Sequence, residues 1–258
     1  MEHSDGANKT LSMRQGLSPS NQWKRHDKSG ARVVGRLAGV FVVLLGSTVI
    51  PARSQNTVNE FWPEVDTYVT LSPKYRLFLM AQKAVDQDSE QERWQFGPNF
   101  DITLMPILRM KFQTLDPEER KYLTTRIGYR HLISQTGPDE NRMILALTPR
   151  FPLPKSVLLT DRSQVDLRWR NGFSWRYRNR LGAEKNFKIR SLAFSPYVRG
   201  EIFYDSAVSR WNRLSYSGGV VVPICKRVEI APSFERQNIS GSTTNHVNGA
   251  GLTLSLYF

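Results

Sequence analysis

The most constraining feature of this sequence is its C-terminal segment, in which apolar and polar residues alternate up to the last residue. One face of a β-strand would carry its apolar members, Leu252, Leu254, Leu256 and Phe258. The other face would carry Thr253, Ser255 and Tyr257. Chain ends usually fray unless they are held by the fold. A terminal strand of this kind is therefore typical of a transmembrane β-barrel, whose last strand pairs with its first and leaves no open edge.

The same ending also predicts a location and an assembly partner. Leu252, Leu254, Leu256, Tyr257 and Phe258 resemble the C-terminal signal that the bacterial barrel-assembly machinery reads. We therefore expect the protein in the outer membrane of a Gram-negative bacterium, surrounded by outer-membrane lipid and lipopolysaccharide.

The N-terminal part of the chain predicts export. Residues 34–50 form the one long apolar run, which is short and interrupted by glycine for a membrane-spanning helix. Basic residues precede it at Lys24, Arg25, Lys28, Arg32 and Arg36, and small residues follow it at Ala52 and Ser54. This order indicates a signal peptide over residues 1–54 with a long basic n-region, and translation that starts at Met13 is an alternative. An uncleaved anchor helix is the other interpretation.

Removal of residues 1–54 leaves a single domain, 55–258, with 28 Lys and Arg against 20 Asp and Glu. Its net charge of +8 would suit a nucleic-acid ligand, but export argues against one, so we expect none. Phosphates of lipopolysaccharide, or anions in the lumen, are the more plausible partners. Cys225 is the single cysteine, which excludes an intramolecular disulfide. We expect a monomer.

The exported domain divides into eleven segments of alternating character, separated by turn residues. They are 58–71, 74–84, 93–108, 119–132, 140–152, 156–170, 173–186, 191–205, 211–223, 226–238 and 246–258. Because single-chain bacterial barrels have even strand numbers, we expect about twelve strands, with ten as the alternative, in an antiparallel up-and-down barrel. Connection 109–120 is long and could contain a short helix. A soluble β-sandwich is the competing fold.

The connections differ at the two ends of the expected barrel. The longer ones are 86–91, 134–141, 206–212 and 238–245, and the short ones are 71–74, 152–155 and 224–226. Long loops outside and short turns inside are the usual asymmetry of outer-membrane barrels. We therefore expect the longer set to face the cell exterior.

Charged residues concentrate on the faces that should point into the lumen. A basic strip is expected from Arg168, Arg170, Arg176, Arg178, Arg180 and Arg199. Acidic partners are expected at Glu64, Asp166, Glu201, Glu229 and Glu235. These charges would either form an ion-pair network that fills the lumen and fixes strand register, or line a path that passes or binds anions. Many Trp, Tyr and Phe residues fall near strand ends, as in the aromatic girdles of membrane proteins.

Enzymatic activity has one candidate, a lipid hydrolase that uses His131. Ser134 lies three positions from His131, so the two side chains point to opposite faces of a regular strand. A nucleophile and its base must lie within about 3 Å of each other. We therefore expect no enzymatic activity, no catalytic residues, no metal site and no cofactor.

Several stretches resemble a family of uncharacterised proteobacterial outer-membrane proteins, domain of unknown function 2490. They include Arg-Tyr-Arg-Asn-Arg-Leu at 176–181 and Pro-Tyr-Val-Arg-Gly-Glu-Ile-Phe-Tyr-Asp at 196–205. Shorter matches lie at 59–65, 73–77, 211–213 and 254–258. The resemblance implies an outer-membrane barrel and brings no activity or catalytic residues. The expected function is thus that of a structural or transport barrel with an Arg/Glu-lined lumen, with a small anion-selective channel as the alternative.

Overall fold

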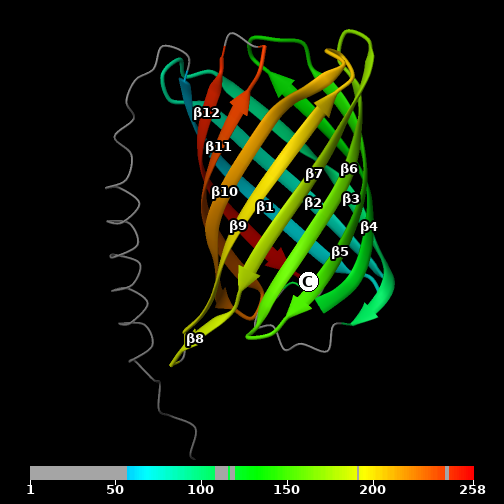
Figure 1. Cartoon of the computed structure of the whole chain (residues 1–258), viewed down its shortest axis with the longest axis vertical. Helices are drawn as coiled ribbons and strands as arrows, with labels where there is room; N and C mark the ends of the chain where they lie inside the picture. The colour runs from blue at the N-terminus through cyan, green and yellow to red at the C-terminus, as the bar shows by residue number, and fades with distance from the viewer. Residues whose placement is uncertain (1–56, 108–115, 117–119, 191, 242–243) are drawn as a thin grey trace, which may run out of the picture. The chain divides into compact units, whose positions relative to one another are not determined.

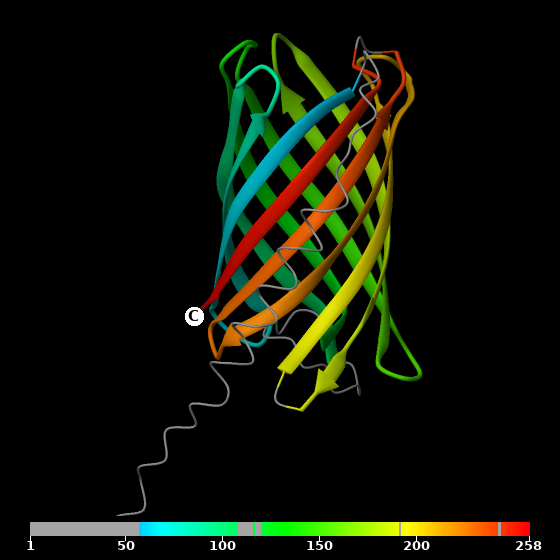
Figure 2. The ribbon, with the colours of Figure 1, turned by 90° about the vertical axis from the view of Figure 1, so that its left-hand side faces the viewer.

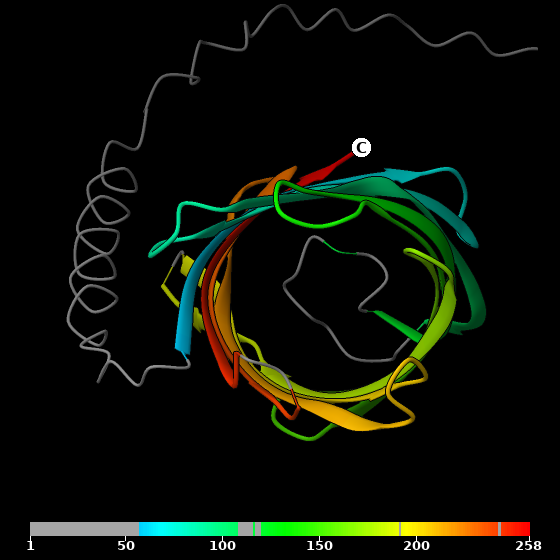
Figure 3. The same cartoon turned by 90° about the horizontal axis from the view of Figure 1, so that it is seen from above.

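Eleven long β-strands close into a barrel, and a short twelfth strand extends it at one end (Figures 1 and 3). This computed structural model describes residues 57–107, 116, 120–190, 192–241 and 244–258. The signal peptide expected at 1–54, and the helix considered within 109–120, lie outside the described residues.

The strands alternate in direction around the barrel. They are β1 (Thr57–Thr70), β2 (Tyr75–Asp86), β3 (Glu92–Ile107), β4 (Lys121–Ser134), β5 (Glu140–Leu153), β6 (Val157–Trp169), β7 (Phe173–Lys185), β8 (Phe187–Ile189), β9 (Leu192–Asp205), β10 (Arg210–Cys225), β11 (Val228–Ile239) and β12 (His246–Tyr257). The three-residue β8 pairs with β9, whereas β9 continues the cylinder between β7 and β10.

The barrel closes through a parallel pair formed by its first and last strands. β1 and β12 run side by side from Thr57 opposite His246 to Tyr68 opposite Tyr257. The amide of Phe258 donates to the carbonyl of Tyr68 at 2.9 Å, and the amide of Thr70 donates to the carbonyl of Phe258 at 3.0 Å. The alternating C-terminal segment is thus held by main-chain hydrogen bonds up to its final residue.

The expected all-β barrel of about twelve strands is confirmed, with one difference in how the strands are used. The described chain has twelve strands, but eleven of them close the cylinder, which is the number of segments counted in the sequence. The even number usual in bacterial barrels is not followed. An odd number of up-and-down strands makes the first and last strands point the same way, which is why β1 and β12 are parallel.

The two ends of the barrel carry different connections. All four of the longer loops expected from the sequence lie at one end, here called the long-loop end, and the turns at 71–74, 154–156 and 226–227 lie at the other, the short-turn end. β1 and β12 both run from the long-loop end to the short-turn end. Thr57 and Phe258 therefore lie at opposite ends of the barrel, as the blue and red strands of Figure 2 show.

The outward face of the barrel is mainly apolar. On β5 the outward residues Met143, Leu145, Leu147 and Phe151 are 37–52% exposed, whereas the inward residue Ile144 is fully buried. The outward face of β6 and β7 is interrupted by a polar group, in which Asn179 donates to Asp161 at 2.6 Å and to Ser163 at 3.3 Å. Among the described residues, no helix has the length and apolarity that a membrane span requires.

Trp side chains gather on the outside of the long-loop end. Trp94, Trp169, Trp175 and Trp211 are all exposed, and each lies within four residues of a strand end at that rim. Tyr204 packs between two of them, with ring centroids 5.4 Å from Trp175 and 5.7 Å from Trp211.

Candidate functional site: an arginine-lined lumen

The interior of the barrel contains a cavity of about 960 Å³. Its lining extends from Gln91 and Gly137 at the long-loop end to Glu184 and Glu229 near the short-turn end. Among the described lining residues there are fourteen arginines, no lysine and eleven carboxylates. Every cation on this surface is therefore a planar guanidinium, which can bind two carboxylate oxygens at once.

The structure places all six arginines of the expected basic strip on this cavity: Arg168, Arg170, Arg176, Arg178, Arg180 and Arg199. The expected acidic residues Glu64, Glu201, Glu229 and Glu235 line it too. Asp166 is fully buried beneath it.

A tight hairpin turn sets the register of the two strands that carry most of the strip. Arg170, Asn171 and Gly172 connect β6 to β7, and the φ angles of Asn171 and Gly172 are 52° and 125°, within the left-handed range that tight hairpin loops use. The resulting register places Asp166 opposite Arg176 and Arg162 opposite Arg180.

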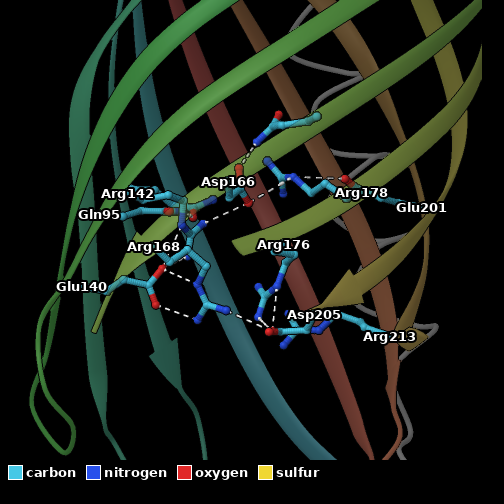
Figure 4. Close-up of polar contacts among 12 residues, drawn as sticks. Gln95, Glu140, Arg142, Asp166, Arg168, Arg176, Arg178, Glu201, Asp205 and Arg213 are labelled. Atoms are coloured by element: carbon cyan, nitrogen blue, oxygen red, sulfur yellow. Dashed lines mark hydrogen bonds and ion pairs between the residues drawn. The ribbon is translucent and has the colours of Figure 1, made fainter. Parts of the chain in front are cut away.

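Near the long-loop end, two carboxylates connect three arginines (Figure 4). Glu140 accepts hydrogen bonds from Arg142 at 2.6 and 2.9 Å and from Arg168 at 2.7 and 2.9 Å. Arg168 also donates to Asp205 Oδ2 at 3.0 Å, and Arg176 donates to the same oxygen at 2.6 Å. This buried chain of ion pairs joins β5, β6, β7 and β9.

A second group lies farther along β7. Arg180 donates to Glu201 Oε2 through Nη2 at 2.8 Å and through Nε at 3.0 Å. The Nε atom of Arg178 lies 3.6 Å from both Asp166 Oδ2 and Glu201 Oε1 (Figure 4). Arg178 and Arg180 are thus held by two of the acidic residues expected from the sequence.

The third group centres on Asp101 of β3. Arg76 donates to Asp101 Oδ2 at 2.7 Å, and Arg126 donates to its Oδ1 and Oδ2 at 2.5 and 2.8 Å. Arg76 also bonds Asp116. The guanidinium of Arg126 lies 4.3 Å from the ring centroid of Phe78. Asp101 therefore joins β2, β3 and β4 from the inside.

The other acidic residues expected as partners accept hydrogen bonds from uncharged side chains. Glu64 accepts from Gln82 at 2.7 Å, Glu229 accepts from Tyr257 Oη at 2.8 Å, and Glu235 accepts from Ser215 at 2.7 Å. Arg199 stacks on the Tyr197 ring at 4.0 Å, and the space beside Gly137 is occupied by the guanidinium of Arg170.

Three arginines on the cavity have a buried Nε without a hydrogen-bond partner in the described part of the chain: Arg130 on β4, Arg162 on β6 and Arg178 on β7. Arg178 lies 3.6 Å from two carboxylates, whereas Arg130 and Arg162 make no ion pair with the described residues. Arg162 was not among the expected site residues, although it continues the inward alternation of Arg168 and Asp166 along β6. The sequence did not predict that Glu140, Asp101 and Asp205 each bind two arginines either, because most of these partners lie far away in sequence.

His131 and Ser134 do not meet. Arg130 and Ser134 line the cavity, whereas His131 lies on the outer face of β4, where its Nδ1 is 2.8 Å from Asn141 Oδ1 and its ring packs on Phe96. The alternation of β4 thus separates this serine from this histidine, as expected from their spacing.

Comparisons with known proteins give a family and one structural likeness. A family model described as a protein of unknown function, DUF2490, matches residues 59–248. The search of curated proteins found no match. Among solved structures, the β domain of the Bordetella autotransporter BrkA is similar with a TM-score of 0.39 and 14% identity, over 71% of this chain and 83% of that chain.

Proposed function

We propose that this chain, which belongs to the DUF2490 family, is a monomeric outer-membrane β-barrel of structural or transport type that passes small anions and performs no catalysis. The observation that carries the proposal is the reversed polarity of the barrel. Its outer wall is mainly apolar, while many of its charged side chains are buried inside, among them Glu60, Asp66, Asp101, Glu140, Arg142, Asp166, Arg168 and Glu201. A soluble barrel would place these groups the other way round, because charge is favoured in water and apolar surface is not.

The Trp residues at the long-loop end support the same placement. Their exposed rings form part of a rim above the apolar wall, which is where aromatic side chains meet lipid headgroups in membrane proteins. The held C-terminal strand supports delivery by the barrel-assembly machinery. Lipid and lipopolysaccharide would then be the natural surroundings of the outer wall.

Anion transport is favoured over a purely structural role by the lumen itself. The cavity reaches residues near both ends of the barrel, and fourteen lining arginines face eleven lining carboxylates together with Asp166 and Asp205, which pair with these arginines. An excess of fixed positive charge in a confined space attracts anions and repels cations.

The absence of catalysis is proposed from the placement of the one serine–histidine candidate. Its two side chains lie on opposite faces of β4, and His131 is hydrogen-bonded to Asn141 on the outer wall. His131 is therefore not positioned to activate Ser134.

The experiment that tests the proposal is single-channel recording of the refolded 55–258 protein in a planar bilayer with a salt gradient. Stable, anion-selective current steps support transport. A silent bilayer with protein shown to be folded by heat-modifiable gel mobility would contradict transport and favour the structural role. Cation-selective steps would contradict the assigned role of the arginines.

Neutralising two arginines of the basic strip should lower anion selectivity. In Arg178→Gln/Arg180→Gln the lumen loses two positive charges that lie beside Glu201. The carboxylates that remain then make the local electrostatic potential more negative. We expect the reversal potential to shift towards cation permeation. Arg236→Gln is the matched control, because Arg236 is exposed and does not line the cavity. Equal reversal potentials in the wild type and the double variant would show that these two arginines do not contribute to ion selectivity.

The parallel closure predicts where the two ends of the exported chain lie. β1 and β12 both run from the long-loop end to the short-turn end. If the long loops face the cell exterior, Thr57 therefore lies on the outer side of the membrane and Phe258 lies on the periplasmic side. An epitope placed directly before Thr57 should therefore be labelled on intact cells. An epitope in the 226–227 turn should be labelled only after the outer membrane is permeabilised. The reverse pattern would overturn this orientation.

A further inference from the structure

The positive charges of the lumen gather on one side of the barrel. Nine of the fourteen lining arginines lie on β4, β5, β6 and β7, and a tenth, Arg170, lies in the turn between β6 and β7. We call this side the arginine wall. Its own carboxylates on the lumen side are Glu140, Asp166 and Glu184. Even with the carboxylates of neighbouring strands that pair with this wall, its arginines stay in excess; these are Asp101, Glu201 and Asp205.

The strands β11, β12 and β1 carry the opposite charge. Among their described lining residues there are five carboxylates and neither arginine nor lysine: Glu60, Glu64, Asp66, Glu229 and Glu235. We call these three strands the acidic wall. Glu60 pairs with Arg93 of β3. Glu64 and Glu235 accept hydrogen bonds from uncharged side chains and make no ion pair with the described residues, so their charge is not cancelled on their own wall.

The order of the strands places the two walls opposite each other. On one side of the cylinder β9 and β10 lie between β7 and β11, and on the other side β2 and β3 lie between β1 and β4. As a group, these four flanking strands carry both signs of charge among their lining residues. In the view down the barrel, β1 (blue) and β12 (red) lie across the lumen from green strands of the arginine wall (Figure 3). Both walls line the same cavity, so a solute inside it faces both.

The opposite charges also lie at a similar level of the barrel. Glu64 and Glu235 lie near the middle of β1 and β11. Arg162, Arg178 and Arg180 lie near the middle of β6 and β7. Because these strands all run between the two ends of the barrel, residues at their centres lie near its mid-height. All five side chains are partly exposed, and they point to the lumen, so water and small solutes inside the cavity reach them.

A lumen with this arrangement has an electric field across its width. A solute that carries separated positive and negative charges gains energy when its anionic end points to the arginine wall and its cationic end to the acidic wall. The gain is larger between protein walls than in open water, because the effective dielectric constant is lower there. An uncharged solute of the same size gains nothing from the field.

We propose that the lumen prefers small zwitterions, which carry one anionic group and one ammonium group, such as free amino acids with an uncharged side chain. The planar forks of the arginine wall suit a carboxylate, while Glu64 and Glu235 attract the ammonium group. This inference rests on the proposed function, because it needs a conducting lumen. It adds a class of electrically neutral solute to the small anions expected there.

Swelling of lipid vesicles that contain the refolded 55–258 protein tests this preference. Glycine and its isomer glycolamide have the same atoms and nearly the same size, but only glycine is a zwitterion. After subtraction of the rates in protein-free vesicles, glycine should enter at least about threefold faster than glycolamide, because a charged lumen raises the local concentration of a matching solute.

Two double variants separate a field across the lumen from a simple excess of positive charge. Glu64→Gln/Glu235→Gln should shift ion selectivity towards anions, and Arg178→Gln/Arg180→Gln should shift it towards cations. Both should nevertheless bring the ratio of glycine to glycolamide rates closer to one, because each weakens one wall. Glu92→Gln is the control for both readouts, because Glu92 does not line the cavity.

Equal rates for glycine and glycolamide in the wild type, or an unchanged ratio in both double variants, would overturn the preference. The wild-type comparison needs no variant, so it decides the matter even where a variant does not fold. If anion-selective current is present together with equal rates, this inference fails and transport stands. A silent bilayer without swelling in either solute would overturn both.

Discussion

Asp101→Asn is expected to destabilise the folded barrel by about 3–5 kcal/mol, because it removes the negative charge of a buried ion pair and leaves the positive charges behind. The Asp101 side chain is only 4% exposed and holds both Arg76 and Arg126. Arg76 keeps Asp116 as a second partner, whereas Arg126 has no other ion pair among the described residues. Urea unfolding in detergent micelles, followed by Trp fluorescence, measures the difference in free energy of unfolding.

Glu92→Gln serves as the control for that measurement. Glu92 pairs with Lys83 near the long-loop end of β3, where both side chains are more than one quarter exposed. Pairs that water reaches contribute little to stability, so the unfolding curve should stay close to that of wild type. If Asp101→Asn unfolds at the same urea concentration as wild type, the ion pairs of the lumen are not what holds the strands together.

Leu145→Arg is expected to destabilise the barrel by about 2–4 kcal/mol when it is folded into lipid vesicles, the range for an arginine facing lipid near the bilayer midplane. Leu145 is an outward residue near the middle of β5, and its neighbours in register are Ile127 and Val165. Neither offers a partner for the new charge. Urea unfolding from vesicles, rather than micelles, provides the measurement.

Leu153→Arg is the matched control on the same face of the same strand. Leu153 is similarly exposed but lies at the short-turn end of β5, where a new arginine reaches the headgroups and costs about 0–1 kcal/mol. A large difference between the two variants supports a membrane around the barrel. Equal destabilisation at both positions would argue against the proposed outer-membrane placement.

The sequence was informative wherever a feature depends on neighbours along one strand. The apolar outward residues of β5, the inward arginines of β7 and the terminal strand of β12 all follow from a repeat of two residues. The same repeat separated Ser134 from His131. The number of strands was the exception. The expectation of an even number came from other barrels, whereas the sequence of this chain gave eleven segments, which is the number that close the cylinder.

The pairing of charges could not be read in the same way. Arg168 reaches Glu140 and Asp205, 28 and 37 positions away, and Asp101 reaches Arg76 and Arg126, 25 positions away on either side. Glu64 and Glu235 line the same cavity as these arginines, and their hydrogen bonds come from amide and hydroxyl groups. The alternation predicts that a side chain points inward, but it does not predict which residues of other strands lie at the same level in the barrel.

The sequence by itself determined that this chain forms a barrel with an apolar outer wall and an arginine-rich interior, because side-chain direction in a strand is a local property. Only the tertiary structure decided which charges meet and that β1 and β12 close the cylinder in parallel. Those outcomes depend on the register and stagger of eleven strands around the cylinder, which are set by many pairings acting together and by no single segment.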